Sequence, residues 1–95
     1  MIILRKSTNS KKKWDAIFPN GVKVSFGAAG YQDYTQHHNP ERMQRYIIRH
    51  QRREDWNDPY TAGFWSRWLL WSKPTMKEAI KVVEKKVHQR IIYET

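Results

Sequence analysis

The tripeptide Pro19-Asn20-Gly21 constrains the fold of this chain more than any other segment. Proline presets φ, asparagine tolerates the next position and glycine supplies a positive φ, so the tripeptide predicts a hairpin with a three-residue connection. The pairs facing each other across this hairpin are Phe18 with Val22, Ala16 with Val24, and Trp14 with Phe26. We expect these six side chains to lie on the core face, and the other face, which carries Asp15, Lys23 and Ser25, to be mostly solvated.

A two-stranded ribbon is marginally stable alone. We therefore expect the strand predicted near residues 2–5 to join it, helices to cover it, or both. Gly27 to Gly30 contains only small residues, so we expect the segment from Gly27 to Tyr31 to be flexible and the polar residues that follow, through His38, to form a loop.

Three helices are predicted after this loop. Asn39-Pro40 is a favourable N-cap and first-turn pair for the first helix, and Asp58-Pro59 repeats this signal for the second. Thr75 to Glu78 is a capping box that opens the third, whose apolar stripe continues to Ile91.

The middle helix, from Pro59 to about Trp71, is apolar nearly all round. Such a helix is buried on most sides, and we take it as the central element. With 95 residues the chain is long enough for one compact core. The sequence therefore predicts a single α+β domain over residues 1–95. Its β-rich part (residues 1–30) is a hairpin or small three-stranded antiparallel sheet, and its helical part (residues 39–92) holds three helices, the middle one aromatic and buried.

The charge balance points to an anionic partner. Lys and Arg number 18 against 9 Asp and Glu, which gives a net charge of +9. The basic residues that we expect to bind this partner fall into three groups: Lys11, Lys12 and Lys13 before the hairpin; Arg42, Arg45, Arg49, Arg52 and Arg53 along the first helix; and Lys77, Lys81 and Lys85 on the last. Such residues give salt-sensitive, sequence-independent contacts to phosphates, and they suit an acidic protein surface as well.

The absence of cysteine excludes disulfides, thiolate catalysis and cysteine-type zinc sites. We expect no targeting segment. We also expect no membrane span, because the most apolar stretch, Phe64 to Trp71, contains Arg67 and is far shorter than the roughly 20 residues required.

Three histidines are the candidates for a catalytic or metal site. His37, His38 and His50 follow the hairpin, in loose similarity to strand-strand-helix metal nucleases, but their spacing is not that of a metal motif. We expect His50 to be a packed core histidine, and His37 and His38 to be loop residues. We predict no catalytic residue, no metal site and no cofactor, and hence a protein that is not an enzyme.

The acidic residues near the end of the first predicted helix have structural explanations. We expect Asp58 to cap the middle helix. Glu54 and Asp55 are expected to neutralise Arg52 and Arg53.

Several motifs carry a resemblance to a known family. They are Val24-Ser25-Phe26-Gly27-Ala28, Gly30-Tyr31-Gln32-Asp33-Tyr34-Thr35, His37, Arg45-Tyr46, Arg49-His50, Glu54-Asp55-Trp56, Thr61-Ala62-Gly63-Phe64-Trp65-Ser66-Arg67-Trp68-Leu69-Leu70-Trp71 and Lys73-Pro74-Thr75. This pattern resembles a family of short proteins of unknown function encoded by large nucleocytoplasmic DNA viruses. The resemblance implies a viral setting and supplies no catalytic residues.

Together, the charge and the resemblance favour a minor structural component of a large DNA virus particle. Its cationic faces would meet acidic shell proteins, membrane headgroups or the genome, in the virion and in the host cytoplasm during assembly. The alternative is a basic nucleic-acid-binding protein that packages or compacts viral DNA, and the third hypothesis is a metal-dependent nuclease.

Overall fold

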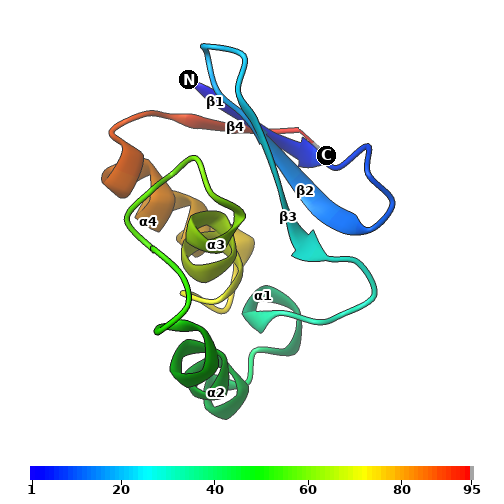
Figure 1. Ribbon diagram of the computed structural model, residues 1–95, viewed down its shortest axis with the longest axis vertical. Helices are drawn as coiled ribbons and strands as arrows, with labels where there is room; N and C mark the ends of the chain where they lie inside the picture. The colour runs from blue at the N-terminus through cyan, green and yellow to red at the C-terminus, as the bar shows by residue number, and fades with distance from the viewer. Residues whose placement is uncertain (95) are drawn as a thin grey trace.

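The computed structural model describes residues 1–94 and confirms an α+β fold, with one mixed sheet and several helices (Figure 1). The elements are β1 (Ile2–Lys6), β2 (Lys12–Ile17), β3 (Lys23–Ala28), α1 (Tyr34–His37), α2 (Pro40–His50), α3 (Ala62–Trp65), the π-helical turn η1 (Ser66–Leu70), α4 (Met76–Val87) and β4 (Ile91–Tyr93). In residues 1–94 no helix combines the length and apolar character needed to cross a bilayer.

The hairpin forms in the predicted register. Trp14 pairs with Phe26 and Ala16 with Val24 across β2 and β3. The Phe18 amide donates to the Val22 carbonyl at 2.9 Å, and Gly21 has the positive φ of +89° that the turn requires. Strand β1 joins the hairpin antiparallel to β2, as expected.

A fourth strand corrects the prediction for the C-terminal region. Helix α4 ends at Val87 instead of reaching Ile91, and β4 then pairs parallel to β1, so the sheet is mixed with strand order β3-β2-β1-β4. His88 turns the chain with a positive φ of +54°. The pairing satisfies the free edge of β1, whose backbone groups need partners, and the β-branched pair Ile91-Ile92 suits a strand. The helical part therefore ends before residue 92.

The middle helix begins later than predicted. Asp58 does not cap it, because its carboxylate accepts from the Tyr60 amide at 3.0 Å in a local turn. Thr61 is the N-cap and accepts from the Phe64 amide at 3.3 Å. The helix then widens into η1, but its burial is as expected, with Phe64, Trp65, Leu69 and Leu70 all buried.

A short helix replaces the predicted loop after β3. Asp33 and Gln36 form a capping box around α1, so His37 closes a helix instead of lying in a loop. Helix α2 begins as predicted, where the Asn39 side chain accepts from the amides of Glu41 and Arg42. Thr75 likewise caps α4 by accepting from the Glu78 amide.

The helices α3, η1 and α4 pack against one face of the sheet, while α2 lies at the far end of the molecule, next to α1 (Figure 1). Trp65 is the centre of this packing, fully buried with its ring 5.6 Å from that of Phe26. The predicted core face of the hairpin is therefore the face that the helices cover, except at the turn, where Val22 is 39% exposed instead of buried.

Asp15 overturns the expectation that its face of the hairpin is solvated, because it is 0% exposed. Its carboxylate accepts from the hydroxyls of Ser7 at 2.7 Å and Ser25 at 2.6 Å, and from the Thr8 amide at 3.3 Å. Burial raises the pKa of this carboxyl, but the hydrogen bonds from these partners outweigh burial and hold the pKa below its ordinary value. The Ser7 to Ser10 loop thus folds over a buried carboxylate.

Candidate functional site

An aromatic stack attaches α2 to the rest of the molecule. The buried Tyr46 ring lies between Trp71, at a centroid distance of 4.4 Å and an interplanar angle of 3°, and His50, at 4.2 Å and 24°. Such contacts add to the energy of burial. The stack places one side of α2 at a fixed position opposite the end of β3.

The Glu54 carboxylate contacts residues on both sides of it and so holds the segment after α2 in place. Its two carboxylate oxygens contact His50 Nδ1 at 3.1 Å and the Trp56 indole N–H at 2.8 Å. Glu54 therefore does not form the predicted ion pair with Arg52 or Arg53. His50 is partly exposed and paired, and is not the packed core histidine that we expected.

Gly27 allows η1 to approach the hairpin closely. Its φ is +78°, and a Cβ atom there would lie 3.0 Å from Leu70 Cδ1 and 3.2 Å from Lys13 Cβ. Only glycine fits both the conformation and the space without a shift.

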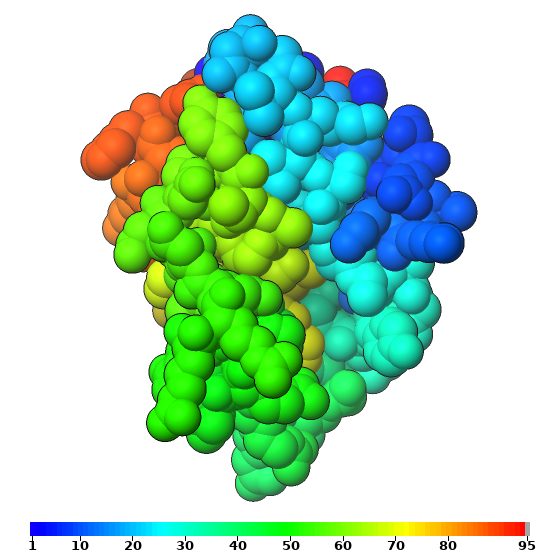
Figure 2. Space-filling model, in the orientation of Figure 1, coloured from blue at the N-terminus to red at the C-terminus, as the bar shows by residue number. Residues whose placement is uncertain are grey.

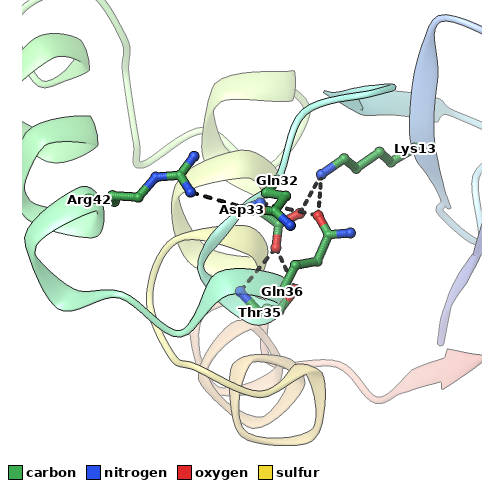
Figure 3. Close-up of polar contacts among 6 residues, drawn as sticks. All are labelled: Lys13, Gln32, Asp33, Thr35, Gln36 and Arg42. Carbon is green, nitrogen blue, oxygen red and sulfur yellow. Dashed lines mark hydrogen bonds and ion pairs between the residues drawn. The ribbon is translucent and has the colours of Figure 1, made fainter.

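The loop that follows Gly27 is held by the buried carboxylate of Asp33 (Figure 3). Lys13 Nζ donates to Asp33 Oδ2 at 2.7 Å and to Gln36 Oε1 at 2.8 Å. The Thr35 amide and hydroxyl both donate to Asp33 Oδ1, and the Arg42 guanidinium donates to Gln32 Oε1 at 3.4 Å. Lys13 thus ties β2 to the loop and to α1.

A hollow of about 510 Å³ opens between this loop and α2. Its basic lining residues are Lys12, Lys13, Arg42, Arg49 and His50, and its acidic ones are Asp33 and Glu54. Lys13 pairs with Asp33, and His50 with Glu54. Within residues 1–94, the other three cations have no carboxylate at ion-pair distance, so the hollow carries uncompensated positive charge.

A second hollow of about 560 Å³ adjoins the first. The two share the lining residues Lys12, Lys13, Tyr31, Gln32 and Asp33, and the second adds Lys6 and Trp14. Figure 2 shows the loop after β3 and α2 on the same face of the molecule. We call the two adjoining hollows the basic groove.

The structure divides the predicted basic residues. Lys12, Lys13, Arg42 and Arg49 line the basic groove, which draws on β2 and α2. Lys11, Arg45, Arg52 and Arg53 are exposed and do not line it. Lys81 and Lys85 line a separate hollow of about 490 Å³, and Lys77 is exposed at the start of α4.

The sequence prediction missed Lys6, Tyr31, Gln32 and Asp33 as members of this site. One signal was available, because Asp33 and Gln36 have the spacing of a capping box and so mark an ordered helix start. The grouping of Lys6 with Lys12 follows from the pairing of β1 with β2, which local sequence does not reveal.

His37 lies beside the site as a neutral side chain. Its Nδ1 accepts from the Asn39 amide at 2.9 Å, which leaves the proton on Nε2. Burial lowers the pKa of His37, and the Arg42 charge lowers it further. In the part of the chain that the structure describes, no group of three or more His, Cys, Asp and Glu side chains is placed to hold a metal ion.

One protein-family model matches the N-terminal half of the chain. A model described as a family of unknown function (DUF5754) matches residues 2–50, a segment that runs from β1 to the end of α2 and contains the groove cations. No curated protein and no solved structure matches the chain. Since the matched segment spans more than half of the sequence, the chain belongs to this family of unknown function, DUF5754.

Proposed function

We propose that this protein binds nucleic acid through the basic groove and catalyses no reaction. The observation that carries the proposal is the charge left in the groove after internal pairing. Lys12, Arg42 and Arg49 surround the first hollow without carboxylate partners in residues 1–94. Cations that no internal carboxylate neutralises are available for phosphate groups.

The residues that line the groove also support this proposal. Arg42 and Arg49 come from one helix and Lys12 from a strand, so the cations that line the recess come from two separate elements and not from a single helical stripe. Arginine can hold a phosphate with two parallel hydrogen bonds. The exposed Tyr31, between the two hollows, adds an aromatic surface.

Removing the three groove charges should weaken binding. In the variant Lys12→Gln/Arg42→Gln/Arg49→Gln, we expect affinity for a labelled DNA oligonucleotide at low salt to fall about 10-fold or more. The slope of log affinity against log salt should become shallower by about 2–3, because each phosphate contact contributes about 0.7–0.9. Fluorescence anisotropy across a salt series measures both quantities.

The matched control removes three charges from α4, in the variant Lys77→Gln/Lys81→Gln/Lys85→Gln. It lowers the net charge equally but leaves the groove unchanged, so its loss of affinity should be clearly smaller. Equal losses from both variants would point to nonspecific attraction and contradict a groove site, and no binding of the unchanged protein at low salt would overturn the proposed function.

A second candidate function is a minor structural component of a large DNA virus particle, found in the virion. The separate cationic hollow at the C-terminal half of α4 favours it, because Lys81, Lys85 and Arg90 do not line the groove. One surface would hold the genome while the other contacts an acidic shell protein or headgroups. The resemblance to proteins of large DNA viruses supports this setting.

This candidate predicts that the protein is retained in purified virus particles after salt washes that remove loosely attached proteins. Quantitative mass spectrometry of such particles measures its copy number against the major shell protein. Absence from the particles would contradict the structural role and leave nucleic-acid binding during infection as the remaining function.

A further inference from the structure

We propose that the basic groove holds single-stranded nucleic acid, with a base stacked on Tyr31. This inference rests on the proposed function and specifies its ligand. It is carried by the position of one exposed aromatic ring between two cationic recesses.

Tyr31 is 74% exposed, which makes it the most exposed of the aromatic side chains in the protein. It lines both hollows, at the place where they meet, together with Lys12 and Gln32. Cations hold the backbone of a single strand while aromatic faces stack its bases, and every base offers such a face. Tyr31 is therefore placed where a strand crossing from one hollow to the other would present a base.

The concave shape favours a single strand over a duplex. The two hollows have volumes of about 510 and 560 Å³, large enough for a small organic group such as an unstacked base. In a duplex the bases are already stacked on one another and the phosphates lie on a convex cylinder. A duplex could reach the rim cations but could not bring a base to Tyr31.

The stacking surface is fixed in place before binding. Tyr31 lies two residues before Asp33, whose carboxylate is buried and bonded to Lys13 and Thr35 (Figure 3). On the other side, Gly27 packs against Lys13 and Leu70. A loop anchored at both ends loses little conformational freedom when a ligand binds.

The cations of the groove lie on both sides of Tyr31, along the course proposed for the strand. Lys6 lines the second hollow, Arg42 and Arg49 line the first, and Lys12 is common to both. A strand lying along the groove would therefore meet positive charge before and after the stacked base. Four phosphate contacts would give a salt slope of about −3 for a single strand.

The first test compares labelled oligodeoxyuridylate, oligouridylate and a DNA duplex of equal length, about 20 nucleotides, by fluorescence anisotropy at low salt. We expect at least one of the single strands to bind about 10-fold more tightly than the duplex. The comparison of the two single strands identifies the preferred sugar, DNA or RNA. Equal or tighter binding of the duplex overturns the inference but not the proposed function, and binding of none of the three overturns both.

The second test replaces the ring. Tyr31→Ala should weaken single-strand binding about 5- to 100-fold, the effect of losing one stacked base, while Tyr31→Phe should stay within about 2-fold of the unchanged protein. Tyr60→Ala is the control, because Tyr60 is also an exposed tyrosine but does not line the groove. Thermal melts check that all three variants fold. If Tyr31→Ala binds as the unchanged protein does while the groove-charge variant loses affinity, stacking is wrong and phosphate binding stands.

Discussion

The variant Trp65→Ala is expected to lose about 3–5 kcal/mol of unfolding free energy. The indole is 0% exposed, its ring lies 5.6 Å from Phe26 and 6.1 Å from Phe18, and its N–H donates to the Pro59 carbonyl at 2.7 Å. Alanine would leave a cavity between α3 and the sheet. A chain of this length has a total stability of about 5–14 kcal/mol, so the melting temperature should fall by about 12 °C or more.

Urea unfolding and thermal melting followed by circular dichroism measure this loss. Trp65→Phe separates packing from hydrogen bonding, because it keeps an aromatic ring but leaves the Pro59 carbonyl without its donor, and it should cost less than alanine does. Ile48→Ala is the matched surface control, since Ile48 is 64% exposed, and it should change stability by no more than about 0.5 kcal/mol. Similar losses for Trp65→Ala and Ile48→Ala would contradict the packing of α3 on the sheet.

The elements that local chemistry specifies could be predicted from the sequence. Pro19-Asn20-Gly21 determined the hairpin and its register, and Asn39 and Thr75 marked the starts of α2 and α4. In each of these cases a side chain satisfies or shapes backbone within a few residues of itself. The α+β class followed from the same signals.

The elements that depend on distant partners could not be predicted. The apolar stripe of the last helix continues to Ile91, but an open edge on β1, some 90 residues away, recruits that residue into β4. The alternation of side chains along β2 places Asp15 on the face opposite the core, where the sequence predicts solvent. In the structure the loop from Ser7 covers this face and buries Asp15. Periodicity gives the direction of a side chain but not what covers it.

The candidate site likewise combines features that local sequence predicts with features that depend on distant contacts. The basic residue types and their segments were evident, but sequence gave no reason to place Lys12 with Arg42 and Arg49 instead of with Lys11. That grouping follows from the stack of Tyr46 on Trp71, which joins α2 to the aromatic core. The aromatic residues thus serve stability and position the groove cations at the same time.

The variant Asp15→Ala should be the most destabilising change on the other face of the hairpin, with a loss of about 2–4 kcal/mol. It removes a buried carboxylate from the hydroxyls of Ser7 and Ser25 and from the Thr8 amide. These three donors lose the acceptor that they share. Asp15→Asn should lose less, because its amide oxygen still accepts from one of them.

Two measurements distinguish this network from a simple loss of packing. In a double-mutant cycle, Ser25→Ala should cost much less in the Asp15→Ala background than in the unchanged protein, with a coupling of about 1 kcal/mol or more, because both changes remove the same 2.6 Å hydrogen bond.

The second measurement is the pH dependence of the free energy of unfolding. The pKa of Asp15 is lowered in the folded state, so an unfolded chain takes up the proton first as the pH falls. The stability from Asp15 is therefore present above about pH 3.9 and lost below it as the folded carboxyl titrates. The difference in stability between the unchanged protein and Asp15→Asn, measured by urea unfolding, should shrink between pH 5 and pH 2, whereas a difference independent of pH would mean that Asp15 contributes through its shape and not through its charge.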